Sequence, residues 1–233
     1  MVLSRCSVLF LSSILVLVSC GRSGSEKQSI EEISSNEDTA HQNNDSPAFE
    51  RLVESYEDPD RGVWQNPNLI IEQFGNLTGK TVADIGAGTG YFSFKLAANG
   101  ADVIAIDIDE QFLEYIEERK QELVGLSGNI ETRLSIPDDP LMDQYEADFI
   151  LIVNTYHFLN KRDIYLSKLR AGLKEMGKII IVDFRAGKLP VGPLEKDKIN
   201  IEIVEEELKA AGFSQIKRDT SALKYQFMII ANR

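Results

Sequence analysis

The 233-residue sequence predicts an α/β fold: a mostly parallel sheet with helices on both faces and an antiparallel hairpin at its C-terminal end. Between residues 81 and 211, short apolar segments alternate with segments of helical periodicity, as expected for parallel strands joined by crossover helices. A glycine-rich turn, Gly86–Gly90, follows the first apolar segment. Two further β-type segments follow the last helix, and their proximity predicts the hairpin.

Seven strands and six helices account for this pattern. The expected strands are Thr81–Ile85, Asp102–Asp107, Ile130–Leu134, Asp148–Val153, Lys178–Phe184, Gln215–Asp219 and Tyr225–Ala231. The expected helices between and after the strands are Tyr91–Asn99, Glu110–Leu123, Arg162–Leu173 and Ile203–Ala211. Ahead of the first strand, apolar residues at helical spacing from Phe49 to Tyr56 predict one short helix, and Asn68–Phe74 predicts another. Asp58-Pro59 separates these two helices, because the residue before a proline disfavours helix.

Composition excludes several classes of function. Hydrophobic residues make up 43% of the chain, enough for a folded core, and the net charge of −12 argues against nucleic acid as a partner. Both cysteines, Cys6 and Cys20, lie in the first twenty residues, so the remaining chain has no cysteine for a disulfide or a metal site. The only histidines are His41 and His157, and we therefore expect no metal centre.

The N-terminal residues 1–19 predict a signal peptide. One basic residue, Arg5, precedes an apolar run of about 13 residues, which is shorter than the ~20 that a membrane-spanning helix needs. Leu17-Val18-Ser19-Cys20 resembles a bacterial lipobox, and this resemblance implies cleavage before Cys20 and lipidation of its thiol. The protein would then be a membrane-anchored lipoprotein of the cell envelope; a plain secretory signal and an uncleaved anchor are the alternatives.

Residues 20–47 predict a disordered acidic tether, because they are rich in Ser, Asn, Gln and Glu and cannot bury enough apolar surface to fold. His41 lies within it as a solvated residue. The folded domain is expected to span residues 48–233.

The turn after the first strand carries the chemistry. Its spacing is Gly-x-Gly-x-Gly, at Gly86, Gly88 and Gly90, whereas nicotinamide dehydrogenases use Gly-x-Gly-x-x-Gly to rest a pyrophosphate on a helix N-terminus. Asp84, two residues before the first glycine, would repel a pyrophosphate and suits a cationic amino-acid group instead. Asp107 ends the next strand, where a carboxylate can accept hydrogen bonds from both hydroxyls of a ribose.

The run Asp84-Ile85-Gly86-Ala87-Gly88-Thr89-Gly90, followed by Asp107, resembles the first motif of class I S-adenosylmethionine-dependent methyltransferases. The resemblance covers about residues 49–231 and implies their Rossmann-like seven-stranded sheet. It is closest to a bacterial subgroup of predicted methyltransferases without a settled substrate. That subgroup is similar to the chain in four segments: Asp60-Arg61 with Trp64-Gln65 and Pro67, Pro137-Asp138-Asp139-Pro140, Asn154-Thr155-Tyr156-His157, and Pro190-Val191-Gly192-Pro193.

The resemblance implies S-adenosyl-L-methionine as the cofactor. The glycine turn, Gly86 to Gly90 with Ala87, would line its methionine and ribose portions, and Asp84 would hold the turn or contact the amino group. Asp107 would bind the ribose and Ile108 would pack on the adenine. The remaining expected cofactor residues are Asp138, near the adenine amino group or simply a solvated turn carboxylate, and Asn154, near the sulfonium.

Methyl transfer is an in-line displacement with a neutral leaving group, so positioning and exclusion of water supply much of the acceleration. A base is needed only when the acceptor must lose a proton. His157 and Tyr156, just beyond the fourth strand, are the candidates, and the alternative is that His157 shapes the pocket without titrating. Arg61 and Trp64 lie in a segment expected to cover the cofactor mouth, where Trp64 either contacts ligands or packs as an anchor.

The sequence therefore predicts a methyltransferase whose unidentified acceptor is a small molecule rather than a protein. The alternative is a non-catalytic envelope lipoprotein that binds S-adenosylmethionine or S-adenosylhomocysteine. The oligomeric state is not predicted.

Overall fold

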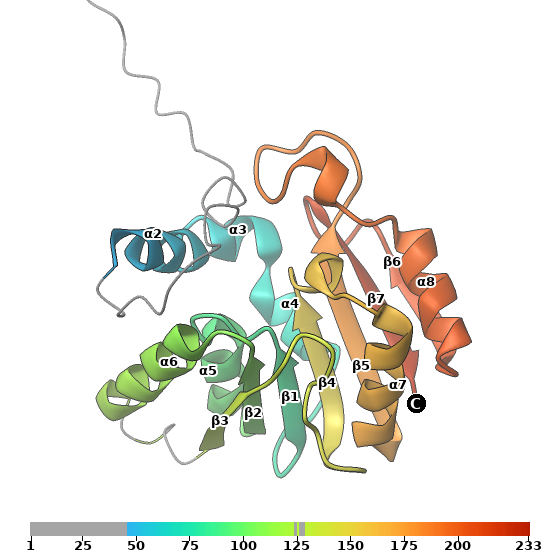
Figure 1. The fold of residues 1–233 in the computed structure, drawn as a ribbon, viewed down its shortest axis with the longest axis horizontal. Helices are drawn as coiled ribbons and strands as arrows, with labels where there is room; N and C mark the ends of the chain where they lie inside the picture. Colours follow the sequence, from blue (N-terminus) through green and yellow to red (C-terminus); the bar gives the residue numbers. More distant parts are fainter. Residues whose placement is uncertain (1–45, 124, 126–128) are drawn as a thin grey trace, which may run out of the picture.

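In the computed structural model, which describes residues 46–123, 125 and 129–233, seven strands form one sheet in the order β3-β2-β1-β4-β5-β7-β6 (Figure 1). The strands are β1 (Thr81–Ile85), β2 (Asp102–Asp107), β3 (Ile130–Leu134), β4 (Ala147–Val153), β5 (Leu173–Phe184), β6 (Ser214–Asp219) and β7 (Gln226–Asn232). β1 to β5 are parallel, and β7 pairs antiparallel with both β5 and β6. The predicted fold class, with its C-terminal antiparallel hairpin, is confirmed. The predicted signal peptide, 1–19, and the tether up to residue 45 lie outside the described residues.

The order of the strands reverses between β1 and β4. From β1 the chain moves outward through β2 to β3, and it then returns to the other side of β1 as β4. In open α/β sheets, ligands bind beyond the carboxyl ends of the strands at such a reversal point. Gly86 and Asn154, which directly follow β1 and β4, are the first residues at this point.

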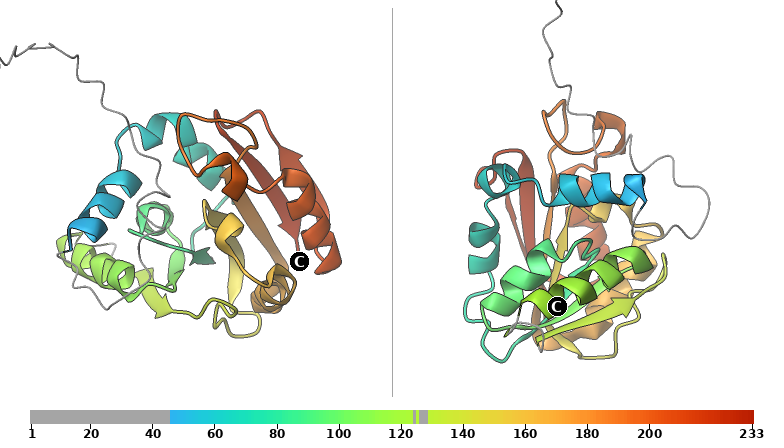
Figure 2. Two further views of the ribbon diagram at one scale, coloured as in Figure 1. Left: turned by 45° about the horizontal axis from the view of Figure 1, so that its top comes forward. Right: turned by 90° about the vertical axis from the view of Figure 1, so that its left-hand side faces the viewer.

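Helices cover both faces of the sheet (Figures 1 and 2). The helices that follow the strands are α5 (Tyr91–Ala98), α6 (Glu110–Glu122), α7 (Arg162–Gly172) and α8 (Ile201–Ala210). One apolar cluster joins α5 and α6 to one face, and a second joins α7 and α8 to the other. Successive side chains of β4 point to opposite faces of the sheet, and both sets are apolar. Ile150 and Ile152 belong to the second cluster, and Leu151 and Val153 belong to the first. No helix in the described part of the chain is long and apolar enough to cross a membrane.

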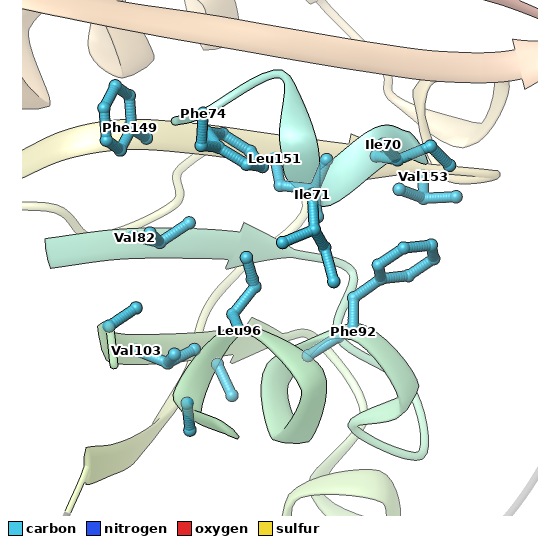
Figure 3. Packing of buried hydrophobic residues seen from close by; sticks show 14 of the residues in the cluster. Ile70, Ile71, Phe74, Val82, Phe92, Leu96, Val103, Phe149, Leu151 and Val153 are labelled. Carbon is cyan, nitrogen blue, oxygen red and sulfur yellow. The ribbon is translucent and has the colours of Figure 1, made fainter. Parts of the chain in front are cut away.

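Three short helices precede β1: α2 (Pro47–Tyr56), α3 (Arg61–Gln65) and α4 (Pro67–Glu72). α4 extends the first cluster, where its Ile71 points toward Leu96 and Phe92 of α5 and its Ile70 lies beside Val153 of β4 (Figure 3). α2 packs on α6 through Phe49, whose ring centroid lies 5.1 Å from that of Phe112. This N-terminal segment is therefore fixed to the helices that surround the glycine turn.

Some boundaries differ from the predicted ones. α2 begins at Pro47 because Ser46 caps it by accepting a hydrogen bond from the backbone N–H of Phe49, so the predicted tether ends earlier than residue 47. α3 was not predicted, since five residues are too few to show helical periodicity. β5 begins at Leu173 rather than Lys178, because Leu173 is buried and pairs with Ala147 across an irregularity in the ladder.

Candidate cofactor site and methyl-transfer site

The glycine turn is held against the end of β2. The backbone N–H groups of Gly86 and Ala87 both donate to the carbonyl oxygen of Ile106, at 2.8 and 3.1 Å. Gly86 has φ +70°, and a Cβ built on it would lie 2.3 Å from the Thr155 hydroxyl oxygen. Only glycine fits here, because the position combines left-handed backbone with contact against the residue that follows Asn154. The turn thus forms a cradle at the reversal point that a side chain at Gly86 would fill.

Asp107 lies at the end of β2 facing this turn. Its carboxylate accepts hydrogen bonds from the backbone N–H groups of Gly88, at 2.8 Å, and Asp109, at 3.1 Å. Burial raises the pKa of Asp107, and these two hydrogen bonds oppose that shift. Each carboxylate oxygen retains a second lone pair, so Asp107 can also accept the two hydroxyls of a ribose. Asp109 instead caps α6 by accepting from the N–H of Gln111.

Beside Asp107, three large apolar side chains are exposed. Ile108 is 59% exposed, Leu134 47% and Ile136 53%. Leu134 is the register partner of Asp107, and the N–H of Ser135 donates to the Asp107 carbonyl oxygen, so these residues lie at one edge of the sheet. They offer an apolar surface suited to an adenine ring beside the ribose carboxylate.

Asp138 lies in the following turn, where its carboxylate accepts a hydrogen bond from Nζ of Lys161. Asp138 is therefore held in a surface ion pair, which fits the alternative of a solvated turn carboxylate, and its place near the adenine amino group stays a prediction.

Asp84 is buried behind the turn. Its carboxylate accepts a hydrogen bond from the Ser93 hydroxyl at 2.7 Å. Burial raises the pKa of Asp84 to about 6, and the bond from Ser93 and the positive charge of Arg61 act in the opposite direction. A carboxylate this poorly solvated is suited to a cationic ligand group nearby.

The N-terminal segment closes over the turn. The Thr89 hydroxyl donates to the Glu57 carboxylate at 2.6 Å, and the ring of Tyr56 lies 3.4 Å from where a Cβ on Gly88 would be. The Arg61 guanidinium stacks 4.1 Å above the ring centroid of Tyr91, the first residue of α5. This segment is therefore in direct contact with the turn, where sequence analysis placed it.

Trp64 packs against two aromatic residues near the end of β5 and the start of β7. Its ring centroid lies 5.7 Å from that of Phe184, at the end of β5, and 6.4 Å from that of Tyr225. These contacts fit the anchoring role rather than contact with a sulfonium.

His157 and Asp183 form a buried pair at the carboxyl ends of β4 and β5. His157 Nδ1 lies 2.9 and 3.0 Å from the two carboxylate oxygens of Asp183, and their side chains are 3% and 1% exposed. Because an ionised carboxylate only accepts, Nδ1 carries the proton that faces Asp183, and Nε2 is the buried nitrogen on the other side of the ring. This is the arrangement of a base oriented by an acid.

Tyr156 faces elsewhere. Its side chain is fully buried in the cluster beneath α7 and α8, and its hydroxyl donates to Glu207 of α8 at 2.7 Å. Burial and Glu207 both raise the pKa of the Tyr156 hydroxyl. The structure does not bring this hydroxyl to His157, so His157 is the remaining candidate base.

Three polar residues of this region were not predicted from the sequence. Asp183 could have been noticed, because it is an acid within the apolar run of β5. Gln65 was noticed only as part of the segment shared with the subgroup, and Gln226 gave no signal. Both are fully buried, and the Gln65 amide donates to Gln226 Oε1 at 3.1 Å. Gln226 in turn donates to Oδ1 of Asn154. These contacts connect α3 to the reversal point.

The sheet matches the Rossmann-like fold of S-adenosylmethionine-dependent methyltransferases, and the glycine cradle with Asp107 is suited to S-adenosyl-L-methionine as the cofactor. Comparison with known proteins agrees. Residues 83–179 match a family model described as a methyltransferase domain. A solved S-adenosylmethionine-dependent methyltransferase from Aquifex aeolicus superposes with a TM-score of 0.72 at 26% identity, covering 78% of this chain and 97% of that one.

Two curated relatives are similar over shorter stretches. The chain is 32% identical over 89 residues to a magnesium-protoporphyrin O-methyltransferase from Rhodobacter capsulatus, which is 38% of each protein. It is 36% identical over 86 residues to a ubiquinone biosynthesis O-methyltransferase from Acinetobacter baylyi, which is 36% of this chain and 34% of the relative. The matched stretches span less than two fifths of these relatives.

Proposed function

We propose that the protein transfers a methyl group from S-adenosylmethionine to a small-molecule acceptor. The observation that carries the proposal is the pairing of Asp107 with the glycine cradle at the β1–β4 reversal point, beside the exposed apolar surface of Ile108. The two curated relatives above are named for small-molecule acceptors, a porphyrin and a quinone precursor, which supports that acceptor class.

The chain's own residues divide the work between binding and proton handling. The turn and Asp107 hold the ribose, while Asp84 and Arg61 set the charge around the amino-acid portion. When bound, the cofactor supplies an electrophilic methyl group on sulfur, whose departure as a thioether needs no proton. His157, oriented by Asp183, receives the proton of a protic acceptor once that acceptor displaces the contacts that bury Nε2.

Calorimetry with S-adenosylhomocysteine on the full chain tests the proposal. Ligand at about 100 times its dissociation constant stabilises a fold by roughly 2.7 kcal/mol, so thermal unfolding provides a second readout. Well-folded protein that binds nothing at millimolar ligand would refute the function. NAD serves as the control ligand, because the glycine spacing and Asp84 disfavour its pyrophosphate.

We further propose that the domain is held at a membrane of the cell envelope by a lipid on Cys20. The support is the Leu17–Cys20 segment after a short apolar core, together with the acidic composition of the residues that follow. The mass of the mature N-terminus tests this proposal.

A further inference from the structure

Four side chains from three distant parts of the sequence form a continuous hydrogen-bonded row. Arg61 Nε donates to Gln65 Oε1 at 2.6 Å, and Gln65 Nε2 donates to Gln226 Oε1 at 3.1 Å. Gln226 Nε2 then donates to Oδ1 of Asn154. The two glutamines are fully buried, so water cannot replace these bonds.

Arginine fixes the direction of the whole row. A guanidinium has donors and no acceptor, so the Gln65 atom that faces Arg61 must be the oxygen. The other end of the Gln65 amide is then NH₂ and must meet the oxygen of Gln226. By the same step, Gln226 must present its NH₂ to the oxygen of Asn154. Each amide therefore has a single orientation that satisfies its neighbours.

The last residue of the row, Asn154, presents its side-chain NH₂ at the point where the strand order reverses between β1 and β4. Because Oδ1 of Asn154 is occupied by Gln226, the group that Asn154 offers to a ligand is Nδ2, for which no acceptor exists among the described residues. The backbone N–H of Asn154 donates to Val182, and its neighbour Thr155 lies against Gly86. Asn154 is thus placed between the cofactor cradle and the strand that carries Asp183.

We propose that Asn154 selects an oxygen nucleophile, so that the acceptor is a hydroxyl compound and the protein an O-methyltransferase. This inference rests on the proposed function and narrows its substrate class. A hydroxyl oxygen has two lone pairs: one attacks the methyl carbon, and the other accepts the hydrogen bond from Asn154 Nδ2. An amine nitrogen has one lone pair, which the attack uses, and its remaining N–H groups would face another donor.

In the methyl transfer, His157 accepts the proton that the hydroxyl group loses. The O–H proton moves to Nε2 of His157, which the bound acceptor must first uncover because this atom is buried, while the new O–C bond forms. The S–C bond breaks, and its electron pair stays on sulfur as the neutral thioether of S-adenosylhomocysteine. The hydrogen bond from Asn154 strengthens as negative charge develops on the oxygen, so it favours the transition state over the ground state.

A variant remote from the ligand tests the direction of the row. In Gln65→Glu, one carboxylate oxygen still accepts from Arg61, and the other requires a donor from Gln226. Gln226 must then turn its oxygen toward Asn154, and Asn154 must turn its own oxygen toward the site. Asn154→Asp should have the same effect directly, because one oxygen still accepts from Gln226. Gln121→Glu, on the exposed side of α6, is the control for the added charge.

Hydrogen exchange of side-chain amides, followed by ¹⁵N NMR on the full chain with S-adenosylhomocysteine bound, decides the proposal without a known acceptor. In the wild type, the Gln226 NH₂ should be protected and the Asn154 NH₂ should exchange rapidly. In Gln65→Glu the Asn154 NH₂ should become protected. Protected Asn154 protons in the wild type would overturn the proposal, whereas failure to bind S-adenosylhomocysteine would instead overturn the proposed function.

Turnover gives the second readout, with 4-hydroxybenzoate against 4-aminobenzoate and 8-hydroxyquinoline against 8-aminoquinoline as probes. The oxygen member of any accepted pair should be methylated faster, and Gln65→Glu and Asn154→Asp should each lower its rate about ten- to a hundredfold. Gln121→Glu should leave that rate unchanged. Faster methylation of the amino member would refute the inference.

Discussion

Asp107 and Asp109 lie two positions apart but have different partners. Asp107 accepts from the glycine turn and faces the cradle, whereas Asp109 caps a helix at its first turn. The two carboxylates therefore form a matched pair of substitutions.

Asp107→Ala should weaken S-adenosylhomocysteine binding far more than Asp109→Ala. The first change removes the ribose acceptor and a bond to Gly88, with an expected loss of about 1–3 kcal/mol, while the second removes a cap. Isothermal calorimetry on both variants measures the difference. Equal affinities would contradict the assignment of Asp107.

Asp84 gives a pH dependence whose sign follows from its burial. The folded pKa of about 6 lies above the usual aspartate pKa of 3.8, so the folded state binds the proton more tightly than the unfolded chain. This group's contribution to the free energy of unfolding is therefore favourable below about pH 4 and falls as the pH rises to about 6, by up to about 3 kcal/mol.

Asp84→Asn should remove that dependence, because the amide still accepts from Ser93 and does not ionise. Urea unfolding of both proteins from pH 4 to pH 7 measures it. The variant should gain stability relative to the wild type as the pH rises, and curves that remain parallel would show that Asp84 ionises freely in the fold.

His157→Gln and Asp183→Asn should both lower turnover while leaving cofactor affinity nearly unchanged. A positioned base contributes about 10²–10⁴-fold in rate. Asp183→Asn removes the negative charge that stabilises a protonated ring, so this variant should also lower the rate even where its amide oxygen still accepts from Nδ1. S-adenosylhomocysteine formation with an accepted substrate is the measurement. If both variants turned over at the wild-type rate, His157 and Asp183 would shape the pocket without transferring a proton.

Site residues could be predicted from the sequence where their partners are close in sequence, and could not where the partners are distant. Asp84 and Asp107 could be predicted because their spacing from the glycines is local in sequence. The Tyr156 hydroxyl could not be placed, since its partner Glu207 lies 51 residues away. Asp138 had two possible roles, and its ion pair with Lys161 depends on how two turns meet.

At the scale of elements, the turn between β1 and α5 combines two constraints, backbone conformation and contact. Gly86 and Gly75 both have positive φ, +70° and +77°, but of these two only Gly86 lacks space for a Cβ. Substitutions at the two glycines therefore separate the cost of left-handed backbone from the cost of the contact with Thr155.

Gly75→Ala should destabilise the fold by about 1–2 kcal/mol, the cost of a non-glycine residue in this conformation. Gly86→Ala should cost more and should also weaken S-adenosylhomocysteine binding, because the turn must move away from Thr155. Chemical denaturation and calorimetry measure the two effects. Equal destabilisation with equal affinity would show that the cradle adjusts freely.

The central strands were predictable because each is an apolar run bounded by turn residues, and β1, β2 and β3 have the predicted bounds. The start of β5 was not, because Lys174 and Glu175 are polar and Met176 is 92% exposed. Pairing with β4 extends the strand there, and pairing is a tertiary effect that a local pattern does not contain.

At the scale of the whole molecule, the proposed lipid on Cys20 would be the point of attachment to the membrane. The residues after Cys20 would connect this point to the domain. Mass spectrometry of the mature protein should find an N-terminus at Cys20 carrying acyl chains, since several chains hold a protein firmly and one only marginally. Cys20→Ser should release the domain from membranes, with Cys6→Ser as the control. An unmodified Cys20, or a start elsewhere, would end this proposal.

Gln65 and Gln226 lie 161 positions apart, and their hydrogen bond sets an order of events during synthesis. Translation delivers α3 and the glycine turn early and β7 near the end, so a ribosome-bound chain that stops short of Gln226 holds Asn154 with no amide to orient it. The nascent domain can therefore acquire the parallel strands β1 to β5 before its acceptor preference. On the proposal above, chemical discrimination waits for the pairing of β7 with β5, which brings Gln226 to Asn154.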